Sequence, residues 1–148
     1  MGNTMPDTEI LDLAISKEIE AYRLYKKMAG RASDPQMKQI LEGFANEELE
    51  HKARLELELM KLGVAVPSKK PTLSDDADDE PAGDIEFKDL LVLAIEKERR
   101  ALRFYIDLAA MTTDKASHEM LVTLAEEEAM HEARFEVEYN ILMRNQSK

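Results

Sequence analysis

Hydrophobic residues recur at steps of three and four along four segments of the chain, a spacing that places them on one face of an α-helix. The segments are residues 8–32, 35–62, 86–111 and 115–145. In the first, the stripe consists of Leu11, Ala14, Ile15, Ala21, Tyr22, Tyr25 and Met28. Helices of about 25 residues are each about 37 Å long. The pattern therefore predicts an all-α protein built as a four-helix bundle.

The residues between these segments carry helix-start and helix-stop signals. Asp7 is a candidate N-cap for the first helix, and Pro35 suits the first position of the second. Gly63 is expected to cap the C-terminus of the second helix. Residues 63–84 read as a linker with an acidic run at 75–80. Three prolines forbid a regular helix there, namely Pro67, Pro71 and Pro81.

The second half of the chain repeats the first with a shift of 80 residues. Without a gap, residues 10–62 align with 90–142 and are identical at 21 of 53 positions. We therefore expect one domain, residues 1–148, made of two antiparallel hairpins at about 8–62 and 86–145. The linker is long enough to run the length of the bundle, at up to about 3.3–3.6 Å per residue. A long crossover would make the second and third helices parallel.

Acidic residues and histidines lie inside the apolar stripes at repeated positions. Each hairpin has one glutamate on its first helix and a Glu-x-x-His pair on its second, where the three-residue step puts both side chains on one face. The residues are Glu18, Glu48 and His51 in the first hairpin, and Glu98, Glu128 and His131 in the second. Each hairpin is thus predicted to aim two carboxylates and one imidazole into the interior.

Four buried carboxylates repel one another, and each ion buried alone costs several kcal/mol. Two divalent cations would balance the four negative charges if both imidazoles are neutral. Carboxylate oxygens with one nitrogen per metal suit iron or manganese, with zinc as a possible substitute. A single Glu-x-x-His in an acidic helix is weak evidence, and such groups often face solvent. Two copies in register favour a two-metal site.

Four further repeated residues border this predicted centre. Tyr25 and Tyr105 could donate hydrogen bonds to ligand carboxylates, or be ordinary aromatic residues of the core. Glu47 and Glu127 could hold an imidazole N–H on an adjacent helix, or lie in solvent.

Composition excludes several classes of protein and site. The chain has no cysteine, which rules out disulfides and cysteine-ligated metals within it. The net charge of −11 disfavours nucleic acid as a partner. No apolar run is long enough to cross a membrane, and the first residues show no secretory signal. These features are compatible with a cytoplasmic location.

The repeated segments resemble the ferritin-like di-iron carboxylate superfamily, and within it the rubrerythrin-type domain. The likeness lies in AISKEIEAYRLY and AIEKERRALRFY, followed by ANEELEHKAR and AEEEAMHEAR. It implies that the six residues bind two iron ions, with Glu48 and Glu128 bridging and Glu18 and Glu98 terminal. It also implies a homodimer. Two features depart from rubrerythrins: a cysteine-ligated rubredoxin iron is absent, and Ala101 stands where they carry an extra glutamate.

The resemblance implies an oxidoreductase that reduces hydrogen peroxide or dioxygen, of peroxidase or ferroxidase type. An external electron-donor protein would have to reduce its iron again. One alternative is a non-catalytic iron-binding or iron-sensing bundle. Another is a metal-free helical module for protein interaction.

Overall fold

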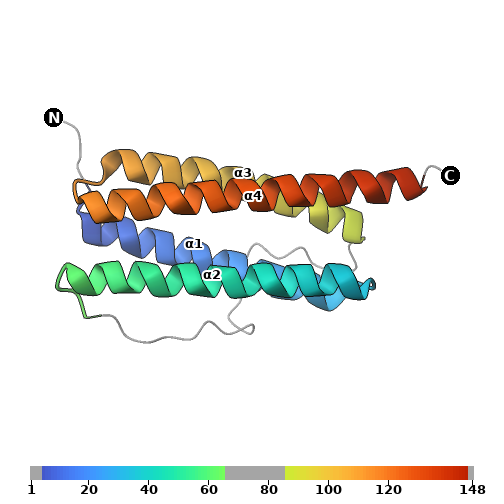
Figure 1. Cartoon of the computed structure of the whole chain (residues 1–148), viewed down its shortest axis with the longest axis horizontal. Coiled ribbons are helices and arrows are strands. Elements are labelled where there is room, and N and C mark those ends of the chain that lie inside the picture. The colour runs from blue at the N-terminus through green and yellow to red at the C-terminus, as the bar shows by residue number, and fades with distance from the viewer. Residues whose placement is uncertain (1–4, 66–85, 147–148) are drawn as a thin grey trace.

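Four α-helices packed side by side form the described part of the protein (Figure 1). The computed structural model describes residues 5–65 and 86–146, and these residues contain no β-strand. The helices are α1 (Asp7–Arg31), α2 (Pro35–Lys61), α3 (Phe87–Met111) and α4 (Lys115–Gln146). The predicted all-α bundle is confirmed. Within the described ranges, no helix combines the length and hydrophobicity that a bilayer crossing requires.

The bundle consists of two helical hairpins laid against each other. α1 packs along α2 and α3 along α4, while smaller contacts join α1 to α3 and α2 to α4. The colours of Figure 1 show that α2 and α3 run in the same direction, as do α1 and α4. This arrangement agrees with a crossover between α2 and α3. The predicted linker falls largely outside the described residues, as does the acidic run at 75–80.

Local signals in the sequence account for both ends of α2. The side chain of Asp34 accepts a hydrogen bond from the backbone N–H of Gln36 at 3.3 Å, and Pro35 is the first helical residue. At the other end Gly63 has a φ of 90°, which glycine adopts without strain. The N–H groups of Gly63 and Val64 then bond the carbonyls of Met60 and Leu59 at 3.0 and 3.1 Å.

Asp7 is not the N-cap of α1, contrary to the sequence prediction. Pro6 occupies that position, and Asp7 is the first helical residue. Its carboxylate instead accepts bonds from the backbone N–H and hydroxyl of Thr113 at 3.0 and 2.8 Å, and from the N–H of Asp114 at 3.0 Å. Asp114 in turn caps α4, accepting from the N–H of Ser117 at 2.9 Å. Hydrogen bonds of Asp7 thus link the start of α1 to the turn between α3 and α4.

The core is divided into two apolar clusters by a polar layer. The first includes Ile10, Leu11, Leu55, Leu59, Tyr105, Leu108, Leu121 and Leu124. The second includes Tyr25, Met28, Met37, Leu41, Leu90, Leu91 and Phe135. Every helix contributes to both clusters, and on every helix the predicted glutamates and histidines lie between its two contributions. The apolar clusters therefore seal the polar layer from both ends of the bundle.

Candidate metal centre

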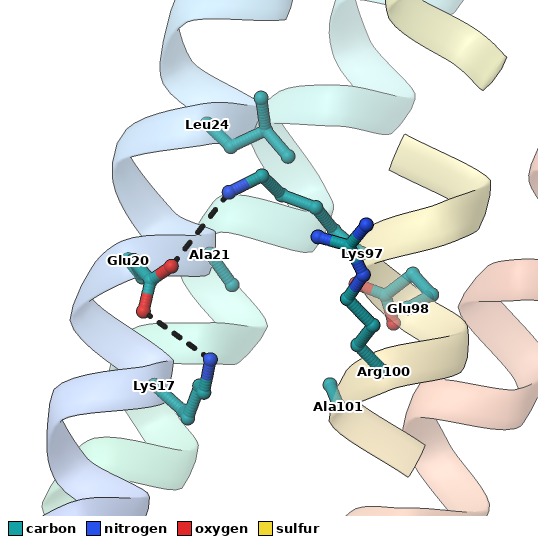
Figure 2. Close-up of a pocket in the computed structure, with 8 residues that line it drawn as sticks. All are labelled: Lys17, Glu20, Ala21, Leu24, Lys97, Glu98, Arg100 and Ala101. Atoms are coloured by element: carbon teal, nitrogen blue, oxygen red, sulfur yellow. Dashed lines mark ion pairs between the residues drawn. The ribbon is translucent and has the colours of Figure 1, made fainter. Parts of the chain in front are cut away.

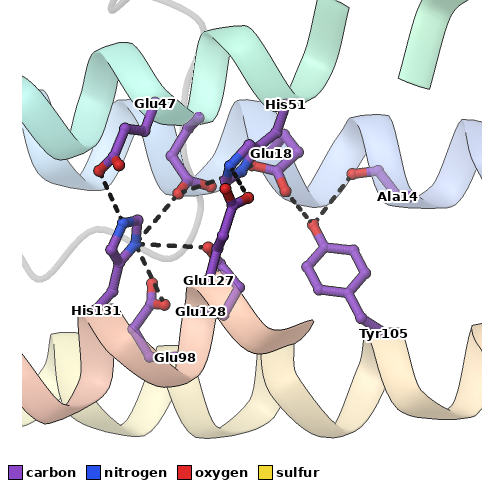
Figure 3. Close-up of polar contacts among 10 residues, drawn as sticks. Ala14, Glu18, Glu47, His51, Glu98, Tyr105, Glu127, Glu128 and His131 are labelled. Carbon is purple, nitrogen blue, oxygen red and sulfur yellow. Dashed lines mark hydrogen bonds and ion pairs between the residues drawn. The ribbon is translucent and has the colours of Figure 1, made fainter. Parts of the chain in front are cut away.

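The polar layer contains all six side chains that the repeat singled out. Each is at most 4% exposed. They are Glu18 on α1, Glu48 and His51 on α2, Glu98 on α3, and Glu128 and His131 on α4. The helical repeat placed them on the inner faces, and packing of the two hairpins brings them together (Figure 3).

The six side chains form two overlapping groups. One contains Glu18, Glu48, His51 and Glu128, and the other Glu98, Glu128 and His131; within each group, one donor atom per residue lies within 4.8 Å of the others. Glu128 belongs to both. Glu48 Oε1 is 3.9 Å from His51 Nδ1 and 3.4 Å from His131 Nδ1. Glu48 and Glu128 therefore lie centrally, and Glu18 and Glu98 lie one at each side.

Both imidazoles turn Nδ1 inward and Nε2 outward. His51 Nδ1 is 3.4 Å from Glu18 Oε2, and His131 Nδ1 is 3.5 Å from Glu128 Oε1. On the outer side, His131 Nε2 is 3.0 Å from Glu47 Oε2, and His51 Nε2 contacts Glu127. Each outer glutamate thus reaches the histidine of the other hairpin. A carboxylate that accepts the Nε2 proton leaves the Nδ1 lone pair directed at the centre.

The two repeated tyrosines differ in their contacts. The Tyr105 hydroxyl lies 2.7 Å from Glu18 Oε1, to which it donates, and 3.4 Å from the Ala14 carbonyl oxygen. The hydroxyl of Tyr25 is buried without a hydrogen-bond partner among the described residues. Of the two repeated tyrosines, Tyr105 alone therefore donates a hydrogen bond to a carboxylate of the centre among the described residues.

An aromatic neighbour that sequence reasoning missed supports one of the histidines. Phe44 stacks on His131, with ring centroids 4.1 Å apart and planes inclined by 22°. Tyr25 meets the same imidazole edge to face at 6.0 Å. The position equivalent to Phe44 in the second hairpin is Leu124. This break in the repeat, seven residues before a ligand-type histidine, was the available signal.

Burial and mutual repulsion make three of the carboxyl groups hard to ionise. Burial, and then the neighbouring Glu18 and Glu128, raise the pKa of Glu48 well above its ordinary range. Burial and then Glu128 do the same for Glu98. Burial and then Glu18 raise the pKa of Glu128 to about 8, although contacts with Glu48 and His51 oppose the rise. Without a cation, these three carboxyl groups would therefore tend to hold protons.

The pKa values of the two imidazoles are shifted in opposite directions. Burial favours the neutral form of each. For His51 the contacts with Glu18 and Glu127 outweigh burial, and its pKa is raised. For His131 burial prevails over the attraction of Glu47, and its pKa is lowered. The equivalent histidines are therefore electrostatically different.

The donor atoms fit a pair of divalent cations. Several inward atoms have no hydrogen-bond partner in the described part of the protein: Glu18 Oε2, both oxygens of Glu48, Glu98 Oε2, Glu128 Oε1, and Nδ1 of His51 and of His131. Buried polar atoms without partners are costly and rare. Four carboxylates and two nitrogens in overlapping groups would satisfy two hard or borderline cations and would cancel their charge.

Comparison with known proteins adds to this geometry. The family profile described as Rubrerythrin matches residues 9–139. A search of curated proteins found no match.

Two solved structures share the fold. A hypothetical protein from Pyrococcus furiosus is 24% identical, with a TM-score of 0.75, and the match covers 95% of this chain and 92% of that one. A two-domain protein from Anabaena variabilis has DJ-1/ThiJ/PfpI-like and ferritin-like domains. It is 20% identical, with a TM-score of 0.74, over 93% of this chain and 37% of its own. The likeness to the second protein thus covers only part of its length.

Proposed function

Because this chain belongs to the rubrerythrin family, we propose that it is a non-haem di-iron oxidoreductase that reduces hydrogen peroxide or dioxygen. The observation that carries the proposal is the set of inward donor atoms without partners, gathered from both hairpins in a layer sealed by apolar clusters. A purely structural bundle gains nothing from such a layer, since each buried carboxylate destabilises it.

In this proposal each group of side chains holds one iron ion. Glu18 and His51 would bind one ion and Glu98 and His131 the other, with Glu48 and Glu128 bridging. Manganese or zinc would fit the same donors. A ferrous pair would supply the two electrons that convert hydrogen peroxide and two protons into two molecules of water.

Residues around the six ligands would orient the imidazoles, hold a proton and exclude water. Glu47 and Glu127 would accept the outer imidazole protons, which fixes the tautomer and keeps Nδ1 free to bind metal. The Tyr105 hydroxyl would hold a proton beside Glu18. Burial, and then the charge of Glu18, raise the pKa of Tyr105 well above its ordinary value, so this phenol stays protonated. The two apolar clusters would exclude bulk water from both ends.

Two further components belong to the proposal. Since the chain has no cysteine, its electrons would come from an external donor protein. The functional unit would be a homodimer, as the resemblance to rubrerythrins implies.

Metal content and oxidation kinetics test the proposal together. Protein produced in iron-rich medium should contain two iron ions per chain, located by anomalous scattering at the iron absorption edge between α1–α2 and α3–α4. Stopped-flow mixing of the ferrous protein with hydrogen peroxide should give the near-ultraviolet absorbance of ferric iron faster than free iron does. Glu48→Gln should lose metal, whereas Glu50→Gln, an exposed change on the same helix, should not. Iron bound at these positions without accelerated oxidation would refute the catalytic part.

A non-catalytic iron-binding or iron-sensing role is the second candidate. Ala101 favours it, because rubrerythrins place there a glutamate that takes part in redox-linked ligand exchange. This role predicts a large rise in melting temperature with Fe(II) or Mn(II), together with oxidation no faster than that of free iron.

A further inference from the structure

A cavity of about 150 Å³ opens between α1 and α3 and reaches the carboxylate layer. Its lining includes Glu98, which is 2% exposed and has Oε2 without a hydrogen-bond partner among the described residues. Figure 2 shows Ala21 on α1 and Ala101 on α3 at the sides of this cavity. A small molecule in the cavity would therefore lie next to a donor atom of the proposed metal pair.

A second cavity, between α2 and α4, meets the centre differently. It is lined by Phe44, Glu47 and His131. His131 turns Nε2 toward Glu47 and is covered by the stacked ring of Phe44. An occupant of this second cavity would face the outer side of the imidazole, while the α1–α3 cavity is lined by Glu98, a carboxylate of the centre itself.

The α1–α3 cavity combines equivalent residues of the two hairpins. Lys17 and Lys97 occupy the same position in the repeat, as do Ala21 and Ala101. A space lined by both members of each pair straddles the axis that relates the hairpins. Approach along that axis leads to the midline of the centre, between Glu18 on one side and Glu98 on the other.

The rim of the cavity is positively charged on a strongly acidic protein. Lys17, Lys97 and Arg100 line it together with a single acid at the rim, Glu20. Glu20 lies 3.6 Å from Lys17 and 3.7 Å from Lys97, as the dashed lines of Figure 2 show. The net charge of the chain is −11, so this excess of cations is local. Lysine and arginine supply only hydrogen-bond donors, which suit an anion or a polar oxygen-rich molecule.

We propose that the cavity between α1 and α3 is the binding and access site for a small anion or peroxide-sized polar reactant. Lys17, Lys97 and Arg100 attract it, and the methyl groups of Ala21 and Ala101 leave it room to reach the metal pair. This inference rests on the proposed di-iron function. It assigns the reactant to one face of the bundle and restricts its size to a few non-hydrogen atoms.

Azide, a three-atom anion, is the probe. Its affinity for the iron(III)-loaded protein is measured from the azide-to-iron charge-transfer absorbance, after elemental analysis has established the metal content of each variant. Ala101→Leu fills the cavity and should weaken azide binding at least about tenfold. The double variant Lys17→Gln/Lys97→Gln keeps most of the cavity and should weaken binding about threefold to tenfold, less than a fully buried charge-assisted contact would give, because both ammonium groups are partly exposed.

Two matched variants control for size and for charge. Gly43→Leu adds the same side chain beside the α2–α4 cavity, where a Cβ would meet no atom within 4 Å. Lys38→Gln removes one exposed positive charge elsewhere on α2. Both should bind azide like the original protein.

The possible outcomes separate the two proposals. Failure of the original protein to bind iron would overturn the di-iron function and this inference with it. Normal iron content with unchanged azide affinity in both cavity variants would overturn only the α1–α3 site, as would a loss caused by Gly43→Leu alone. If Ala101→Leu fails to fold, judged by its melting curve, the lysine double variant decides the question.

Discussion

The repeated tyrosines provide a matched pair for measuring one hydrogen bond of the centre. Tyr105 and Tyr25 are equivalent and almost completely buried, but only the hydroxyl of Tyr105 is bonded, at 2.7 Å from Glu18. Tyr105→Phe keeps the ring in its apolar cluster and removes this bond. A hydrogen bond to a charged group contributes about 1.5–3 kcal/mol. We therefore expect the free energy of unfolding of the metal-free protein to fall by about 2 kcal/mol, and the melting temperature by about 4–8 °C.

Tyr25→Phe is the control, because it removes a buried hydroxyl that has no partner. Its free energy of unfolding should be unchanged or slightly higher. Both variants are measured by urea and thermal unfolding after chelation of metal, since a bound cation could change the contacts of both hydroxyls. Equal losses in the two variants, or no loss in Tyr105→Phe, would refute the assignment of the Tyr105 bond as the distinguishing contact.

Other consequences concern charge in the metal-free protein. Glu48→Ala should raise its melting temperature, because a buried carboxyl without partners is removed, and should abolish the rise on adding Mn(II). The pKa values of Glu48, Glu98 and Glu128 are raised, that of Glu128 from 4.5 to about 8. The folded state therefore binds more protons, so urea unfolding should show that the stability these groups contribute is full below pH 4.5 and falls as the pH rises, the part from Glu128 being lost toward pH 8; a flat profile would contradict this. Burial raises the pKa of Asp7, but its bonds from Thr113 and the next residue prevail and lower it below 3.8. Its stabilisation should be present above that pH and fade in acid, and Asp7→Ala, which removes the hydrogen bonds to Thr113 and Asp114, should cost about 1 kcal/mol at pH 7, measured by urea unfolding.

Local patterns in the sequence were sufficient to predict the helices and their pairing. Helix periodicity depends on neighbouring residues, as do the start of α2 at Pro35 and the glycine turn at Gly63, so each could be predicted without tertiary contacts. The exception is instructive. Aspartate is a common N-cap residue, and its place before the first helix predicted that role for Asp7. Its carboxylate instead accepts hydrogen bonds from Thr113 and Asp114, which are more than 100 residues away, and no local pattern can locate such partners.

The amino-acid sequence was sufficient to predict what the two hairpins have in common: the helix faces, the parallel relation of α2 and α3, and six polar positions directed at one interior layer. Repetition is sufficient there, because equivalent residues on equivalent helices meet near the same axis. The features that distinguish the two halves are visible only once the helices are packed: the Tyr105 hydroxyl is hydrogen-bonded and that of Tyr25 is not, Phe44 stacks on His131, and a cavity with a cationic rim opens between α1 and α3. These differences arise where equivalent residues make different contacts across helices, and helix periodicity specifies a face without specifying which side chain lies opposite it.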